Sequence, residues 1–293
     1  AAGSFNILVF GKEKQLAYDR VHLSEYFSGS SHADLAMGTA DWYAEQGVDL
    51  HLNEPVTAID RDARVITTAK GVYPYDELVL ATGSYPFVPP IDGNDQDGCF
   101  VYRTLDDLDA IQASAQTAKT GVVVGGGLLG LEAANALKSL GLQAHVVEFA
   151  PRLMPVQLDD QGGALLRQKI EDLGVQVHTE KATMAIVPGS DARLRMNFAD
   201  DSHLETDLIV FSAGIRPQDT LARACGLEVG ERGGIVVNNQ CTTSDPNIHA
   251  IGECALWNNR IFGLVAPGYT MARTLSAALN KDTGAAFTGA DMS

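Results

Sequence analysis

Residues 121–152 constrain the fold more strongly than any other part of the chain. They read GVVVGGGLLGLEAANALKSLGLQAHVVEFAPR. An apolar run of strand type, 121–124, leads into a glycine cluster. A segment with helical spacing then covers 128–140, and a second apolar run covers 144–149. This order of strand, helix and strand predicts a βαβ unit with two parallel strands.

The glycine cluster lies at the junction between the first strand and the helix. Gly125, Gly127 and Gly130 satisfy the pattern GxGxxG at the place where a dinucleotide site needs it. The first glycine permits a tight turn, the second leaves room for a pyrophosphate, and the third lets the helix pack closely on the strand. The phosphates are then expected at the helix N-terminus, where unpaired N–H groups and the helix dipole favour negative charge.

An acidic residue, Glu148, ends the second strand of this unit. A carboxylate in this position accepts hydrogen bonds from the ribose hydroxyls and repels a 2′-phosphate. The sequence therefore favours NADH over NADPH. Arg152 lies nearby in the sequence and favours NADPH instead, since a guanidinium can bind a 2′-phosphate.

Further elements are predicted on both sides of the unit. Two runs, 5–10 and 77–81, are expected to be buried strands. A proline-rich stretch after residue 83 is expected to be a linker, 184–187 with 193–198 an antiparallel meander, and 233–239 a hairpin. The remaining expected strands are 48–52, 65–69, 175–178, 207–211 and 248–252, and the expected helices are 34–46, 105–117, 165–173 and 270–279.

Composition excludes several classes of partner. The chain has 293 residues and a formal net charge of −16, which argues against nucleic acid or an anionic membrane surface as the main partner. No apolar run reaches the ~18 residues of a membrane span, and the N-terminus lacks the features of a secretion signal. A cytoplasmic location is therefore expected.

Cysteine and histidine spacing excludes further chemistry. Cys99, Cys225, Cys241 and Cys254 form neither a CxxC nor a CxxxxC pair, so neither a redox dithiol nor a thiolate metal cluster is expected. The seven histidines show neither HxxxH nor HExxH spacing. We therefore predict no metal site and disfavour a thiol-based oxidoreductase.

Two more strings, LVLATGSYP at 78–86 and TSDPNIHAIGEC at 243–254, point to a family when taken with the glycine loop. Together the three resemble the FAD/NAD(P)-dependent pyridine-nucleotide oxidoreductases. In that family the ATG segment closes the first part of the FAD unit, and the later strand end reaches the flavin's ribityl and phosphate region. This chain has Glu253 where the family usually has Asp.

Longer strings make the resemblance more specific. They are AYDRVHLSEYFSG, ATGSYPFVPPI, VVGGGLLGLEAANAL, EFAPRLMPVQLDD, VFSAGIRP and GLVAPGYTMA. Over nearly the whole chain they resemble the N-terminal flavin module of the large subunit of siroheme-containing NAD(P)H nitrite reductases. The resemblance implies an α/β fold with two Rossmann-like dinucleotide-binding domains, of the three-layer ββα sandwich type. The FAD domain would comprise residues 1–102 and 221–293, with the NAD(H) domain, 103–220, inserted in it.

In that family a first strand and its own GxGxxG loop precede the strand that corresponds to 5–10. The resemblance thus implies that the FAD domain of this chain lacks both. An unpaired sheet edge promotes pairing with another chain. We therefore expect marginal stability or association, which includes a homo-oligomer.

The resemblance also assigns residues to both cofactors. Lys12 stands where the family places the ribose acid, so Glu13 is the substitute, and Val56 would act through its backbone at the adenine. The residues for NADH would be Gly125, Gly127, Leu128, Leu129, Gly130, Glu132, Glu148 and Gly214. Those for FAD would be Glu13, Arg20, Ser24, Val56, Ala81, Thr82, Gly83, Arg103, Gly252, Glu253 and the turn Val265, Ala266 and Pro267.

Some of these residues have a structural alternative. Glu132, expected on the first turn of a helix, is favoured there by the helix dipole alone. Arg20 and Arg103 are equally well explained as surface ion-pair partners, and Ser24 as the start of a helix.

The implied function is an NADH:flavin oxidoreductase module. It would pass a hydride from NADH to FAD, and electrons would go on to iron–sulfur and siroheme centres outside this chain. Such a transfer depends on stacking and orientation, so no catalytic side chain is predicted. Two alternatives stay open: a ferredoxin- or rubredoxin-type NADH reductase, and a truncated, flavin-free NAD(H)-binding fragment without catalysis.

Overall fold

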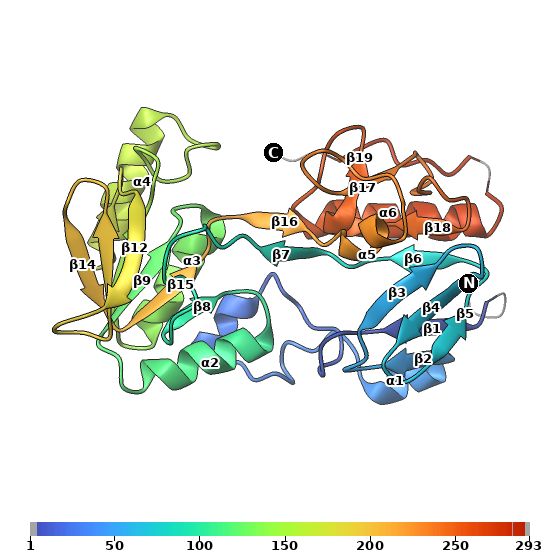
Figure 1. The fold of residues 1–293 in the computed structure, drawn as a ribbon, viewed down its shortest axis with the longest axis horizontal. Helices are drawn as coiled ribbons and strands as arrows, with labels where there is room; N and C mark the ends of the chain where they lie inside the picture. The colour runs from blue at the N-terminus through green and yellow to red at the C-terminus, as the bar shows by residue number, and fades with distance from the viewer. Residues whose placement is uncertain (1–4, 283, 291–293) are drawn as a thin grey trace. The chain divides into compact units, whose positions relative to one another are not determined.

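The computed structural model describes residues 5–282 and 284–290 (Figure 1). The chain forms two compact units. Unit 1 comprises Ala1–Tyr18, Ala36–Tyr85 and Arg216–Ser293, and unit 2 comprises Asp19–Leu35 and Pro86–Ile215. At two places, 85–86 and 215–216, the chain passes from one unit to the other inside a strand, β7 (Ser84–Pro86) and β16 (Ile215–Pro217). The stretch expected as a linker therefore contains a strand.

Unit 2 is built on a five-stranded parallel sheet with the order β11-β10-β9-β15-β8. Its strands are β8 (Cys99–Val101), β9 (Thr120–Val124), β10 (Gln143–Val147), β11 (Gln176–His178) and β15 (Leu208–Phe211). The helices are η1 (Leu23–Ser28), α2 (Leu105–Ala115), α3 (Leu128–Ser139) and α4 (Asp160–Asp172). The predicted βαβ unit is confirmed as β9, α3 and β10.

A second, antiparallel sheet covers one face of the parallel sheet. It consists of β12 (Thr183–Pro188), β13 (Leu194–Phe198) and β14 (His203–Thr206). Val122, Ile209 and Phe211 of the parallel sheet share one buried cluster with Leu194 and Met196 of the meander. Helix α3 contacts β9 and β10 through its own buried face. Two sheets and a helical layer make up the predicted ββα sandwich, which is confirmed.

Unit 1 holds its parallel strands in separate pairs (Figure 1). The pairs are β1 (Ile7–Phe10) with β2 (Val48–His51), β6 (Leu78–Leu80) with β18 (Ile248–Ala250), and β17 (Ile235–Val237) with β19 (Ala255–Trp257). An antiparallel sheet contains β3 (Val56–Asp60), β4 (Val65–Thr68) and β5 (Val72–Pro74). The helices are α1 (Ala40–Glu45), α5 (Thr220–Ala224), η2 (Gly252–Cys254) and α6 (Val265–Leu279).

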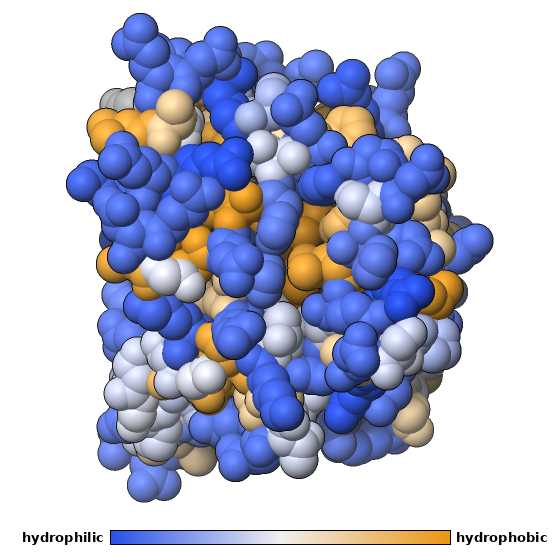
Figure 2. Space-filling model, turned by 90° about the vertical axis from the view of Figure 1, so that its left-hand side faces the viewer, coloured by the Kyte–Doolittle hydropathy of each residue, from blue (hydrophilic) through white to orange (hydrophobic). Residues whose placement is uncertain are grey.

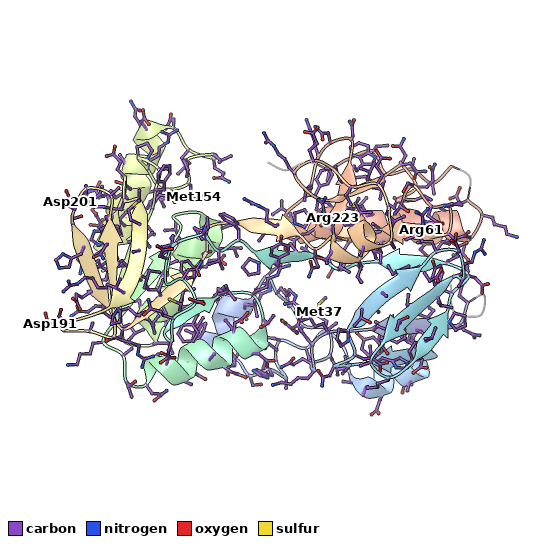
Figure 3. The ribbon with its side chains drawn as sticks, viewed as in Figure 1. Met37, Arg61, Met154, Asp191, Asp201 and Arg223 are labelled. Carbon is purple, nitrogen blue, oxygen red and sulfur yellow. The ribbon has the colours of Figure 1, made fainter. Side chains whose placement is uncertain are left out.

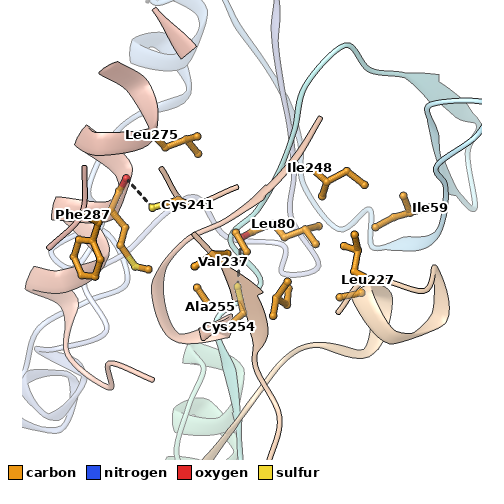
Figure 4. Packing of buried hydrophobic residues seen from close by; sticks show 14 of the residues in the cluster. Ile59, Leu80, Leu227, Val237, Cys241, Ile248, Cys254, Ala255, Leu275 and Phe287 are labelled. Carbon is orange, nitrogen blue, oxygen red and sulfur yellow. Dashed lines mark hydrogen bonds between the residues drawn. The ribbon is translucent and has the colours of Figure 1, made fainter. Parts of the chain in front are cut away.

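Apolar side chains and two cysteines fill the core of unit 1 (Figure 4). Cys241 and Cys254 are fully buried, and their thiols donate to the carbonyl oxygens of Met271 (3.7 Å) and Leu80 (3.3 Å). Burial raises the pKa of Cys241 to about 11. All four cysteines are free thiols, and these two act as small apolar residues.

Several expectations about the elements of unit 1 are wrong. Residues 5–10 are not a buried strand: within the described residues β1 pairs only with β2, and Leu8 and Val9 are 42% and 38% exposed. Residues 233–239 form no hairpin, because β17 pairs in parallel with the distant β19. Residues 265–267 are not a turn but the first turn of α6, because proline is tolerated there.

Two helices also differ in their limits. The helix expected at 34–46 is reduced to α1, which begins after Thr39, whose hydroxyl accepts from the backbone N–H of Trp42. Helix α4 begins earlier than expected, because the side chain of Asp159 caps it at the N–H of Gly162.

Hydrophilic residues cover most of the face that Figure 2 presents, and hydrophobic ones emerge between them in patches. Such a mixture is ordinary for a protein surface. Among the described residues, no helix combines the length and the apolar character that a membrane crossing requires.

Candidate dinucleotide-binding site

The order of the strands in unit 2 puts a topological switch point at the carboxyl ends of β9 and β15. From β9 the chain continues through α3 to β10 on one side, while β15 lies on the other side. Ligands of such sheets bind at this topological switch point. Gly125 follows β9 and Ser212 follows β15, and a Cβ on Gly125 would lie 2.3 Å from the Ser212 carbonyl oxygen. Only glycine fits here, and its φ of +121° also favours glycine.

Two further glycines shape the loop. A Cβ on Gly130 would lie 1.9 Å from the carbonyl oxygen of Gly125, so this glycine lets α3 approach the loop closely. Gly127 differs, because no described atom lies within 4 Å of its would-be Cβ. It begins α3 and has no side chain to cap the helix. The first N–H groups of α3, beside the exposed Leu128 and Leu129, therefore suit an anionic ligand.

Glu148 is tied to the loop by both carboxylate oxygens. Oε2 accepts a 2.6 Å hydrogen bond from the N–H of Gly126, and Oε1 accepts a 2.7 Å bond from the N–H of Ala150. Each oxygen retains capacity for a second hydrogen bond. The carboxylate is thus held in place at the end of β10 and can still accept from a vicinal diol such as a ribose.

Arg152 supports the loop after β10. Its guanidinium donates to the Leu158 carbonyl (2.9 Å), the Asp160 carboxylate (2.7 Å) and the Pro155 carbonyl (3.4 Å). Within this loop the N–H of Met154 donates to the carbonyl of Gly126 (3.0 Å; Met154 is labelled in Figure 3). Sequence reasoning missed this role, because the partners depend on how the loop folds back.

Glu132 lies on the second turn of α3 rather than on the expected first turn, because the helix begins at Leu128. Burial raises the pKa of its carboxyl, and the His22 imidazole opposes that effect. Gly214 follows β15 with a φ of +104°, and its carbonyl accepts from the N–H of Phe87 (2.8 Å). Unit 2 therefore contains every residue that was predicted for NADH: Gly125, Gly127, Leu128, Leu129, Gly130, Glu132, Glu148 and Gly214.

Three residues predicted for FAD also belong to unit 2, namely Arg20, Ser24 and Arg103. Arg20 donates to the carbonyl of Arg103 (2.8 Å), and Ser24 lies on η1. The hydroxyl of Tyr26 donates to Asp109 on α2 (2.6 Å), which raises the pKa of Tyr26 to about 12. These bonds hold segment 19–35 to unit 2.

Unit 1 brings most of the other predicted flavin residues to one place. Ala81, Thr82 and Gly83 follow β6, and Gly252 and Glu253 follow β18, its parallel neighbour. Parallel strands bring their carboxyl ends to the same edge. The two segments are also bonded to their surroundings: Ser84 donates to the Glu253 carboxylate (2.7 Å) and Thr82 to the Gln218 carbonyl (2.5 Å).

Helix α6 begins beside this edge. Its first turn contains Val265, Ala266 and Pro267, and the preceding residue, Leu264, has no polar side chain with which to cap it. A Cβ on Gly268 would lie 3.5 Å from the Cα of Gly252, so the helix start and the loop after β18 are close. Unit 1 thus also presents an uncapped helix N-terminus at this edge.

Glu13 and Val56 belong to another part of unit 1. Glu13 follows β1 and accepts a 2.6 Å bond from the hydroxyl of Tyr18, while Val56 begins β3. Among the described residues, no group of three or more histidine, cysteine or acidic side chains is arranged to hold a metal ion.

Comparison with known proteins identifies relatives of the whole chain. The profile of the pyridine nucleotide-disulphide oxidoreductases matches residues 1–277. The chain is 61% identical over 99% of its length to a nitrite reductase [NAD(P)H] large subunit from Klebsiella oxytoca. It is 55% identical over its full length to the nitrite reductase (NADH) large subunit of Escherichia coli K12. It spans 30% and 35% of these two relatives.

Solved structures agree on the fold. A ferredoxin reductase from Rhodopseudomonas palustris matches 96% of this chain and 71% of its own, with a TM-score of 0.90 and 29% identity. A NAD-dependent persulfide reductase from A. fulgidus matches 98% of this chain and 56% of its own, with a TM-score of 0.91 and 28% identity.

Proposed function

The chain belongs to the pyridine nucleotide-disulphide oxidoreductase family, and from this premise we propose that it is the electron-entry module of a nitrite reductase large subunit. In this role it takes a hydride from NADH onto FAD. The electrons then leave for iron–sulfur and siroheme centres outside this chain. The high identity to nitrite reductase large subunits, of which the chain spans about a third, supports the proposal.

One observation carries the nucleotide part of this function. The N-terminus of α3 is uncapped and opens onto Gly127, while the Glu148 carboxylate is fixed beside it by two backbone N–H groups. A dinucleotide would provide a hydrogen-bond partner for each, because its diphosphate accepts from helix N–H groups and its ribose donates to a carboxylate. Glu132 on α3 and Gly214 after β15 are also proposed to contact the coenzyme, with Gly214 on the nicotinamide side.

The residues present also fit the flavin. The start of α6 and Gly252 suit a phosphate, and the Glu253 carboxylate suits the hydroxyls of the ribityl chain. Bound FAD would supply the chemistry, because flavins accept hydrides and release electrons. The remaining task of the chain is to bind and orient, for which no acid or base is needed.

The coenzyme is NADH rather than NADPH in this proposal. A 2′-phosphate would bring negative charge next to Glu148. Arg152 does not compensate, since its guanidinium already donates to two carbonyls and to Asp160.

A ferredoxin- or rubredoxin-type reductase is the second candidate function. The likeness in fold to a ferredoxin reductase at 29% identity favours it. Both functions share the NADH and flavin sites and differ in the electron acceptor, so the acceptor is what separates them.

Three measurements test the proposal. Purified protein is titrated with ADP-ribose and NADH by calorimetry, its visible spectrum is recorded after incubation with FAD, and NADH oxidation is followed with ferricyanide. We expect saturable binding, flavin absorption bands and turnover. A colourless protein that binds NADH would support the flavin-free fragment instead, and a protein that binds neither nucleotide would refute the function. Reduction of ferredoxin or rubredoxin at a rate above that of ferricyanide would favour the second candidate.

A further inference from the structure

Two histidines on neighbouring strands of unit 2 share a hydrogen bond inside the protein. His145 lies on β10 and His178 ends β11. Nδ1 of His145 and Nε2 of His178 are 3.0 Å apart, and the rings stack with an interplanar angle of 8°. Only one ring nitrogen of such a contact carries the shared proton, so the contact requires that the two facing nitrogens are not both protonated.

The surroundings of the pair are polar on one side only. His145 is 6% exposed, and its register partner on β9, Val122, is apolar and fully buried. The charged groups that act on His178 come from α4 and from the loop after β11. They are Arg167, which is paired with Glu171, and Lys181, which is paired with Asp200. A proton added to the pair would therefore meet two cations, each already paired with an acid.

The pair is bonded directly to the nucleotide site. The backbone carbonyl of His178 accepts from the N–H of Glu148 (2.8 Å), and the N–H of Lys181 donates to the carbonyl of Glu148 (3.0 Å). The N–H of Glu180, two residues after His178, donates to the carbonyl of Ala150, two residues after Glu148 (3.0 Å). The end of β11 thus forms a backbone frame around Glu148, whose side chain in turn holds Gly126.

We propose that His145 and His178 are positioning residues for the dinucleotide site, and that their neutral hydrogen bond keeps the end of β11 in the position that fixes Glu148. Protonation of one ring brings a positive charge to a buried group beside two cations, and protonation of both rings sets N–H against N–H. Either change works against the packing that holds the ends of β10 and β11 together. Glu148 then loses its frame, and affinity for the nucleotide falls. The inference rests on the proposed nucleotide site.

The pKa values give the direction and the range of this effect. Burial lowers the pKa of His145 from 6.5 to about 4, and burial also lowers the pKa of His178. A histidine with a lowered pKa in the folded state favours the neutral form, so the native arrangement gains stability above pH 6.5 and loses it as the pH falls toward about 4. The nucleotide site is expected to weaken over the same range.

The test measures ADP-ribose affinity by calorimetry from about pH 7.5 to about pH 4, the value to which the pKa of His145 is lowered. ADP-ribose is used because NADH decomposes in acid. Half of His145 is protonated at the lower limit, so the wild type is expected to lose at least about twofold more affinity than His145→Gln and His178→Gln over this range. His203→Gln, at an exposed position on β14, is the matched control and should behave as the wild type.

Two outcomes would overturn the inference: an equal loss in the histidine variants and the wild type, or no loss in the wild type. An absence of ADP-ribose binding at neutral pH would instead refute the nucleotide site itself. If a histidine variant does not fold, a titration of the wild type alone still tests the proposal. By linkage, saturating ADP-ribose should lower the pKa values of the two rings further, as followed by NMR, and unchanged values would also reject the proposal.

Discussion

Two helices of the molecule begin in the same way but on different scaffolds. Helix α3 of unit 2 and α6 of unit 1 both start without a polar side chain at the N-cap. At α3 the surroundings are tightly specified, since glycines are required on steric grounds and Glu148 is held by two N–H groups. At α6, Pro267 removes one donor and Gly252 has open space beside it. The uncapped helix is thus only a starting point, and the loops around it define the ligand.

The strands that lead to the two helices also differ in how many neighbours they pair with. Strand β9, which leads to α3, has a paired neighbour on each side, whereas β6, which leads to the loop beside α6, is paired with β18 alone within the described residues. A strand paired on both sides has little freedom to shift. We therefore expect substitutions in unit 2 to have larger and more specific effects on binding than those in unit 1.

The largest effect is expected from Gly130→Ala. Its Cβ would collide with the carbonyl of Gly125, so the loop must move, which costs about 1–3 kcal/mol or more in the free energy of unfolding. ADP-ribose affinity, measured by calorimetry, should fall at least ~100-fold, since about 2.8 kcal/mol corresponds to that factor.

Gly127→Ala is the matched control for this substitution. No described atom lies near its would-be Cβ, so the melting temperature should stay unchanged while nucleotide binding weakens. An unchanged affinity in both variants would show that the ligand does not lie at α3.

Glu148→Ala comes next. The change removes the acceptor for the N–H groups of Gly126 and Ala150 and for the ribose, and hydrogen bonds to a charged group contribute ~1.5–3 kcal/mol. NADH affinity should fall about 10- to 100-fold, whereas NADPH affinity should fall less. Equal losses for the two coenzymes would argue against Glu148 as the residue that selects between them.

A smaller effect is expected in unit 1 from Glu253→Ala. The carboxylate accepts from Ser84, and its loss removes a contact proposed for the flavin, worth ~1 kcal/mol. Retention of FAD, read from the visible spectrum after gel filtration, should fall about fivefold, with NADH binding unchanged. A complete loss of flavin would mean that unit 1 is as tightly specified as unit 2.

The smallest effect is expected from Arg152→Ala. The side chain of Arg152 is 28% exposed, and its bonds stabilise a loop rather than the ligand. Affinities for NADH and NADPH should both fall by about twofold or less, within the ±0.5 kcal/mol typical of substitutions at the surface. A selective loss of NADPH would show that this guanidinium binds the 2′-phosphate after all.

The difference between the units also explains what can be predicted from the sequence. The β9–α3–β10 unit is predictable because its glycines, helical spacing and strand runs are all local signals. The pairings of unit 1 are not, since β6 pairs with β18 far away in the sequence, and β17 pairs with β19 although β18 lies between them in the chain. The short α1 shows a similar limit, because helical composition extends beyond the point where Thr39 caps the helix.

Individual site residues follow the same rule. Glu148 is predictable from its place at the end of a strand, but its bonds to Gly126 and Ala150 are not. The role of Arg152 and the contact between His145 and His178 depend on tertiary arrangement, for which spacing along the chain carries no signal. Grouping of residues 19–35 with unit 2 likewise depends on bonds such as that from Tyr26 to Asp109.

The hydrogen bonds of Arg152 have a practical consequence for redesign. An engineer who wishes to convert the protein to NADPH would gain little by neutralising Glu148 alone, because the nearest guanidinium is already occupied within its own loop. The new positive charge has to be introduced on a side chain that the loop does not need. Phe149, which directly follows Glu148 and is 77% exposed, offers such a place.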